Sequence, residues 1–127
     1  MGQGLVDGKL RACPSKPNCV CSEDPDPAHT IEPLAFEGDA GEAFGAVLAL
    51  VSSDPRAEVR EASGTYVHAV YRTPLLRFKD DVEFRLDAEA KRIHVRSASR
   101  LGYSDLGANR RRIESIRGHW TAARAKS

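Results

Sequence analysis

Two runs of alternating apolar and polar residues constrain the fold most strongly: "DDVEFRLD" at 80–87 and "RIHVRSAS" at 92–99, separated by a short polar turn. Successive side chains of a strand point to opposite faces, so each run has one apolar and one polar face. Two such runs joined by a turn predict an antiparallel β-hairpin. Its register is restricted, because a slip of one residue would move the apolar set from the core into solvent.

The polar face of this hairpin carries charged residues on both strands. Two registers keep the apolar faces together: one pairs Glu83 with Arg96, and the other pairs Glu83 with His94 and Asp81 with Arg96. For Arg85 and His94 we expect a solvated charged face, whose cross-strand pairs contribute below ~1 kcal/mol each. Glu83 and Arg96 differ, because the strand that carries Arg96 runs directly into a polar corner.

The remaining elements follow from periodicity and from residues that break regular structure. Residues 29–38 are expected to be extended, and 39–53 to form a helix that Asp39 caps and Asp54-Pro55 ends. Strands are expected at 57–62, 65–73, 80–87 and 92–99, a connection or bulge at 74–79, and a final helix at roughly 106–124 capped by Ser104 or Asp105. This order predicts an α+β fold: a curved antiparallel sheet of four to five strands with two helices packed on one face, as in helix-grip and TATA-binding-protein-like architectures.

The chain has 127 residues, enough for one domain with a real core. We expect an irregular Cys- and Pro-rich segment at 1–28 and a single α+β domain at 29–127. A net charge of +1 argues against strongly electrostatic partners such as bulk duplex DNA or an anionic membrane. The charge is uneven, however, because residues 22–42 are acidic and residues 91–127 are basic. An anion can therefore bind locally to a chain that is nearly neutral.

The sequence shows no membrane or export signal. No apolar run is long enough to cross a bilayer, and "MGQGLVDGKLRA" has neither a signal-peptide core nor a myristoylation motif. Taken literally, this indicates a cytoplasmic chain, with a removed export segment as the alternative.

All three cysteines lie in "CPSKPNCVC". Cys13 and Cys19 can close a disulfide in an oxidising compartment, which leaves Cys21 as an odd thiol. The alternative is a metal site that also uses His29, but the spacing matches no common zinc pattern. We therefore predict no metal site and no cofactor.

The stretch "RSASRLGYSDLGANRRRI" at 96–113 concentrates polar residues where the last strand meets the last helix. Ser97 and Ser99 have the parity of the apolar residues and should face the core. Asn109 falls within the apolar stripe of the helix, so it needs buried partners, for which Ser97, Ser99 and the turn backbone are the candidates. Gly102 and Gly107 permit a tight turn and a close approach at the helix start.

Three interpretations of this corner stay open. Arg96, Arg100 and Arg110 can present a fork to a carboxylate or phosphate beside the helix N-terminus. Alternatively, acidic neighbours already occupy these arginines and the corner is structural. The third interpretation is catalytic, with Asp80, Asp81 or Glu83 as general base. The predicted ligand-binding residues are Asp81, Glu83, Arg96, Ser97, Ser99, Arg100, Asp105, Asn109 and Arg110.

The chain resembles the bacterial and plant family DUF1499, a domain of unknown function. The matching stretches are "CPSKPNCV" (13–20), "TIEPLAF" (30–36), "FKDDVEFRLD" (78–87) and "RSASRLGYSDLGANRRRI" (96–113). The resemblance implies one compact α+β domain and supplies no activity. Many members are similar to exported or membrane-anchored proteins, which would suit an envelope or periplasmic location and a Cys13–Cys19 disulfide. The chain departs from the family in its lack of a visible export segment and in Cys21, where serine is more usual.

Together these features favour a small non-enzymatic binding or accessory module that holds a small anion or the carboxylates of a protein partner. The alternative is a hydrolytic enzyme that uses Asp80, Asp81 or Glu83 beside the arginines. A nucleic-acid module built on the basic final helix is disfavoured, because aromatic content is only 6% and no motif for reading bases is present.

Overall fold

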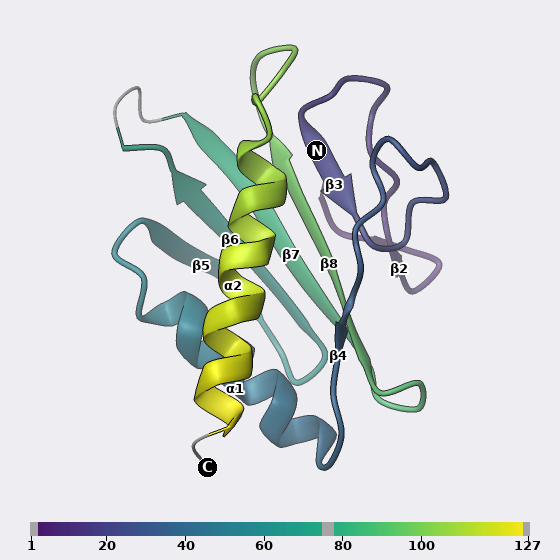
Figure 1. Cartoon of the computed structure of the whole chain (residues 1–127), viewed down its shortest axis with the longest axis vertical. Helices are drawn as coiled ribbons and strands as arrows, with labels where there is room; N and C mark the ends of the chain where they lie inside the picture. Colours follow the sequence, from purple (N-terminus) through teal and green to yellow (C-terminus); the bar gives the residue numbers. More distant parts are fainter. Residues whose placement is uncertain (1–2, 75–77, 126–127) are drawn as a thin grey trace.

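The structure is a computed structural model that describes residues 3–74 and 78–125. Its strands are β1 Leu5–Val6, β2 Lys9–Leu10, β3 Cys19–Cys21, β4 Leu34–Ala35, β5 Ala57–Ala62, β6 Tyr66–Arg72, β7 Lys79–Asp87 and β8 Arg92–Ser99, and its helices are α1 Ala40–Ser52 and α2 Ala108–Ala125 (Figure 1). Residues 75–77, the middle of the predicted connection, lie outside the described residues.

The main sheet has the strand order β3-β8-β7-β6-β5, with β4 also paired to β8, and its named strands pair antiparallel. In the β7–β8 hairpin Glu83 lies opposite Arg96 and Arg85 opposite His94, which is the first of the two predicted registers. The α+β class with an antiparallel sheet is confirmed. The sheet has six strands rather than the expected four to five, because β3 and β4 both pair with β8.

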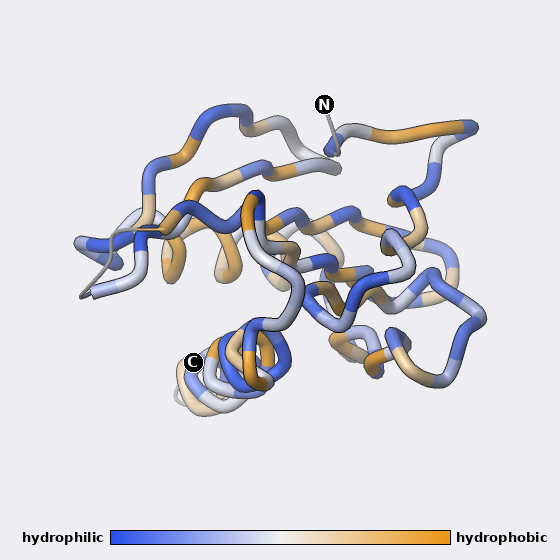
Figure 2. The backbone as a smooth tube through the Cα atoms, turned by 90° about the horizontal axis from the view of Figure 1, so that it is seen from above, coloured by the Kyte–Doolittle hydropathy of each residue, from blue (hydrophilic) through white to orange (hydrophobic). Residues whose placement is uncertain are grey.

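Both helices pack against the apolar face of the sheet (Figures 1 and 2). The core residues from the helices are Phe44, Val47, Val51, Ile113, Ile116 and Trp120, and those from β6, β7 and β8 include Val67, Ala69, Val82, Phe84, Ile93 and Val95. Trp120 Nε1 donates to the carbonyl oxygen of Ala43 over 3.0 Å, which ties the helices together. Asp39 caps α1 as predicted, because its carboxylate accepts the Glu42 N–H at 2.8 Å.

The first part of the N-terminal segment, which carries β1 and β2, lies on the opposite face of the sheet (Figure 2), and β3 then joins the sheet beside β8. There β1 and β2 form a small hairpin, and Leu10 packs against Cys21 and Tyr66. The segment 1–28 was expected to be irregular, yet it contains β1, β2 and β3. These strands are only two or three residues long, too short for a periodic pattern to reveal them.

This segment changes the environment of the polar face of β7 and β8. Arg85 donates to Glu23 from Nε at 2.9 Å and from Nη2 at 2.7 Å, and the ring of His94 is hydrogen-bonded to Ser22 at 3.0 Å. The expectation of a solvated face at Arg85 and His94 was therefore wrong. The polar residues of β7 and β8 alternate with apolar ones, as they would if one face of the sheet lay in solvent. The N-terminal segment covers this polar face, although its own sequence shows no alternating pattern.

Candidate functional site

The sheet divides the predicted ligand-binding residues into two groups. Ser97, Asp105 and Asn109 lie on the helix side, and Asp81, Glu83 and Arg96 lie beneath the N-terminal segment, with Ser99 and Arg100 at the end of β8. The expected convergence of Arg96, Arg100 and Arg110 is wrong. Arg96 and Arg100 line one pocket, whereas Arg110 donates to the carbonyl of Thr30 on the helix side at 3.0 Å. Strand alternation is the cause, since it sends Arg96 to the face opposite α2.

On the helix side, Asn109 is the centre of a hydrogen-bond network and is fully buried. Its Nδ2 donates to Asp105 at 2.7 Å, to Ser99 at 2.9 Å and to the carbonyl of Asn18 at 3.0 Å. Its Oδ1 accepts from the Ser97 hydroxyl. Ser97 and Ser99 are thus partners of Asn109, as the parity of β8 predicted. Asp105 also accepts the backbone N–H of Asn109 at the start of α2, at 3.1 Å.

Arg112 completes this network, and sequence reasoning did not select it. Its guanidinium donates to Asn109 Oδ1 at 2.8 Å, pairs with Asp80 at 2.7 Å and stacks over the Tyr71 ring at 5.2 Å from the centroid. Burial raises the pKa of Asp80 above its usual value, and the charge of Arg112 opposes that rise. Arg112 flanks the apolar stripe of α2. From such a position a long helical side chain reaches back over the preceding turn, and this is the signal that could have identified it. These groups satisfy one another's hydrogen bonds and form a closed network on the helix side.

Glu83 and Arg96 form a buried ion pair beneath the N-terminal segment. Glu83 Oε2 accepts from the hydroxyl of Tyr66 and from the backbone N–H of Gly4. Arg96 donates from Nε to the carbonyl of Arg11 at 2.8 Å. Burial raises the pKa of Tyr66, and its hydrogen bond to Glu83 raises it further. The N-terminal segment thus supplies main-chain partners to both members of the pair.

Asp81 is held by two partners, His68 at 2.7 Å and Arg100 at 2.9 and 3.0 Å. Burial alone would raise the pKa of Asp81, but the hydrogen bonds from His68 and Arg100 lower it well below its usual value. Asp81 is therefore a carboxylate at neutral pH, and it fixes the position of Arg100.

A disulfide joins Cys13 to Cys19 and so ties the N-terminal segment to β3. Cys13 N–H also donates to Asp24 at 2.8 Å. Cys21 is the free thiol, and burial raises its pKa to about 11. The predicted disulfide pairing is thus present in the structure, and Cys21 is a buried thiol that stays protonated.

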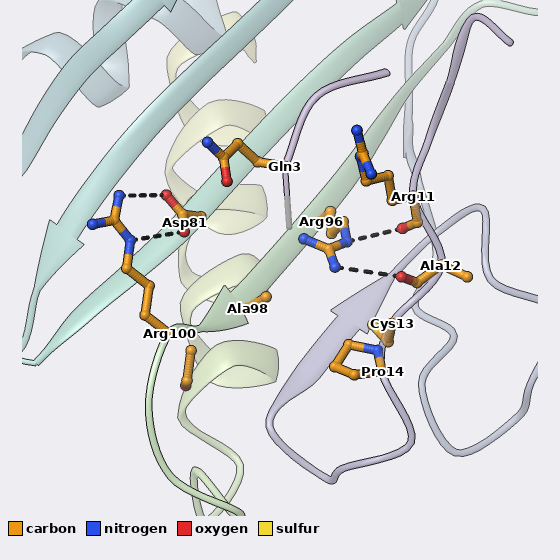
Figure 3. Close-up of a pocket in the computed structure, with 10 residues that line it drawn as sticks. Gln3, Arg11, Ala12, Cys13, Pro14, Asp81, Arg96, Ala98 and Arg100 are labelled. Carbon is orange, nitrogen blue, oxygen red and sulfur yellow. Dashed lines mark hydrogen bonds and ion pairs between the residues drawn. The ribbon is translucent and has the colours of Figure 1, made fainter. Parts of the chain in front are cut away.

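A pocket of about 650 Å³ lies where the N-terminal segment meets the end of β8 (Figure 3). Its lining residues are Gln3, Arg11, Ala12, Cys13, Pro14, Asp81, Arg96, Ala98, Ser99 and Arg100. Figure 3 shows Arg100 turned toward Asp81 and Arg96 toward the main chain of Arg11 and Ala12. The pocket combines guanidinium groups with an apolar wall of alanine, proline and the disulfide. Sequence reasoning missed Arg11, Ala12 and Pro14, because the irregular segment gave no sign of which face it covers.

The carboxylates considered as general bases are all paired with arginines. Asp80 pairs with Arg112, Asp81 with Arg100, and Glu83 with Arg96. A hydrolytic mechanism needs a carboxylate that can take a proton, and none of these three stands apart from an arginine. Within residues 3–74 and 78–125, no group of three or more histidine, cysteine or acidic side chains is placed to hold a metal ion.

Comparisons with known proteins point to one family. The family model described as "Protein of unknown function (DUF1499)" matches residues 9–119, which is most of the chain. No curated protein and no solved structure matches the chain. The two architectures named from the element order therefore stay predictions. In the part of the chain that the structure describes, neither helix combines the length and the apolar character needed to cross a bilayer.

Proposed function

This chain belongs to the DUF1499 family, and we propose that it is a small binding module whose pocket beneath the N-terminal segment holds an organic anion. The observation that carries the proposal is the lining of the pocket by Arg11, Arg96 and Arg100. Its volume of about 650 Å³ is in the range of small-molecule sites. The network around Asn109 is a structural element in this proposal, and Ser99 is the member that it shares with the pocket lining.

The balance of charge around the pocket favours an anionic ligand. Glu83 pairs with Arg96, and Asp81 pairs with Arg100. Arg11 donates from Nε to the carbonyl of Gly4 at 3.3 Å, and no described carboxylate pairs with it. The wall therefore carries one more cation than its carboxylates balance, which suits a ligand with a single negative charge.

The apolar part of the lining selects among anions. The wall without charge is formed by Ala12, Pro14, Ala98 and Cys13, whose sulfur is bonded to Cys19. Inorganic phosphate would leave this wall in contact with water, whereas an organic carboxylate with an apolar body would cover it. The proposal therefore specifies a monocarboxylate that has a short hydrocarbon part.

Thermal unfolding with added ligand tests this proposal. The probes are hexanoate, its uncharged analogue hexanamide, and inorganic phosphate. A probe at about 100 times its dissociation constant adds about 2.7 kcal/mol to the free energy of unfolding, which raises the melting temperature by several degrees. We expect this rise with hexanoate and a much smaller one with the other two.

The matched variants are Arg11→Glu in the pocket and Arg110→Glu on the helix side. Hexanoate should stabilise Arg110→Glu as it does the wild type, but not Arg11→Glu. Equal stabilisation of both variants, or no stabilisation of the wild type by hexanoate, would contradict the proposal.

A further inference from the structure

The loop between β8 and α2 exposes three large apolar side chains within six residues. Leu101 is 72% exposed, Tyr103 is 68% exposed and Leu106 is 84% exposed, the highest values among the exposed large hydrophobic residues that the structure describes. Figure 1 shows this loop projecting beyond the sheet and α2 at one end of the molecule. Single exposed apolar residues are ordinary, but three within six residues of one projecting loop are not.

The backbone of this loop is held in place by long-range and local hydrogen bonds. Asn18 Nδ2 donates to the carbonyl of Gly102 at 2.8 Å, and the Asp105 N–H donates to the carbonyl of Pro17 at 3.4 Å. Arg111 Nη1 donates to the carbonyl of Leu106 at 2.9 Å. The apolar side chains are therefore presented to solvent by a fixed scaffold.

Leu106 has a backbone conformation that disfavours leucine. Its φ is 53°, in the left-handed region where glycine or asparagine fits with less strain. Its side chain is also the most exposed of the three, so burial within this chain does not offset that strain. Contact with an outside surface would bury this side chain and offset the strain.

The surroundings of the apolar tip are basic. Lys79 and Arg111 are exposed, whereas the Arg100 side chain, 39% exposed, is already paired with Asp81. Lys79 lies beside the loop, because its carbonyl accepts the Arg100 N–H at 3.1 Å. Asp105, the acidic residue of the loop, accepts the backbone N–H groups of Gly107 and Asn109 and the Asn109 side chain, so its carboxylate is engaged within the loop. The outward surface of this end thus combines apolar side chains with cations.

We propose that the loop 100–107 docks on the surface of an anionic lipid bilayer. Leu101, Tyr103 and Leu106 enter the interface between headgroups and acyl chains, where the amphipathic ring of tyrosine is favoured. Lys79 and Arg111 contact the headgroups. A bilayer suits a convex tip better than a protein does. Lipids can move apart to admit each side chain, whereas a protein partner needs a groove of matching shape.

The near-neutral net charge is compatible with this local docking. At +1 the whole molecule is weakly attracted to an anionic surface, so binding depends on the apolar tip together with the few cations beside it. Arg100 lies in both the loop and the pocket lining, but the three apolar residues of the docking proposal, Leu101, Tyr103 and Leu106, do not line the pocket. Either proposal can fail without the other.

Co-sedimentation of the whole chain with vesicles tests the docking. The vesicles are phosphatidylcholine alone and phosphatidylcholine mixed with phosphatidylserine. The test variant is Leu101→Ser/Tyr103→Ser/Leu106→Ser, and the control is Leu5→Ser/Val6→Ser, which removes exposed apolar side chains from β1 instead. Near-ultraviolet circular dichroism checks that both variants stay folded.

We expect the wild type to sediment with the mixed vesicles and less with phosphatidylcholine alone. The loop variant should lose at least about tenfold in affinity, because its apolar side chains no longer enter the interface, and the control should bind as the wild type does. No sedimentation of the wild type with mixed vesicles overturns the proposal, as does equal loss in both variants. Self-association that the loop variant abolishes, without vesicle binding, overturns it in favour of a second copy of this chain.

Discussion

Glu83 and Arg96 lie opposite each other on β7 and β8, with Arg96 Nη1 3.5 Å from Glu83 Oε1, and both are buried beneath the N-terminal segment. The opposite charge beside it offsets the cost of burying each charge. Glu83 Oε2 accepts two hydrogen bonds, whereas Glu83 Oε1 has no hydrogen-bond partner and faces only the Arg96 guanidinium. The pair also links the first residues of the chain to the centre of the sheet, since Gly4 donates to Glu83 and Arg11 accepts from Arg96.

Removal of one partner should therefore be costly. Arg96→Met leaves Glu83 as a buried anion without its cation, and we expect the free energy of unfolding to fall by about 3–5 kcal/mol. Glu83→Gln should also destabilise, but the double variant should lose less than the sum of the two, because no unpaired charge remains. Urea unfolding of the three variants measures this coupling. Strictly additive losses would show that the two charges do not stabilise each other.

The second prediction concerns the closed corner on the helix side. Asn109→Ala leaves Ser97, Ser99 and Asp105 without a shared buried partner, so the free energy of unfolding should fall by about 1–3 kcal/mol. The control on the same helix is Thr121→Ala, an exposed position where a change within about 0.5 kcal/mol is expected. If urea unfolding gave the same small loss for both variants, the network would not contribute to stability.

The parts of the fold that could be predicted are those with a repeating pattern. The β7–β8 hairpin follows from strict alternation, and α1 follows from helical spacing behind the capping Asp39. The same parity argument placed Ser97 toward the core and supplied the partners of Asn109. In each case a side chain's position along its own element decides its direction, so no distant part of the chain is needed.

The parts that could not be predicted depend on residues distant in sequence. Arg96 binds main-chain carbonyls of Arg11 and Ala12, and such partners have no sequence signature because every residue has a carbonyl. The pocket exists only because the N-terminal segment crosses the sheet, and nothing in that segment's composition specifies the face. Arg112 rather than Arg110 enters the corner, although the two side chains are equally long. The packing of α2 on the sheet turns Arg112 toward Asp80 and Arg110 toward the carbonyl of Thr30, and that packing has no local sequence signal.

The third prediction concerns the disulfide. Cys13 and Cys19 are separated by 6 positions, and closure of so short a loop lowers the entropy of the unfolded chain by an amount worth about 2 kcal/mol. The variant Cys13→Ser/Cys19→Ser should lose that much stability, and a dithiol reductant should lower the melting temperature of the wild type but not of the variant. If the reductant left the melting temperature of the wild type unchanged, although a thiol assay showed that Cys13 and Cys19 were reduced, this prediction would be contradicted.

The last prediction is a dependence of stability on pH through Asp81. In the unfolded chain an aspartate titrates near pH 4, and in the folded chain His68 and Arg100 hold the pKa of Asp81 lower, against the effect of burial. The unfolded state therefore binds the proton more tightly, so the stability that Asp81 contributes is present above about pH 4 and is lost as the pH falls toward the native pKa.

Asp81→Asn should lower stability at pH 7 and make the decline below about pH 4 shallower. Glu114→Gln, which removes an exposed pair with Arg117, is the control and should change little at pH 7. Urea unfolding from pH 7 down to the acid transition measures both, and an acid decline in Asp81→Asn as steep as that of the wild type would assign the effect to other carboxylates.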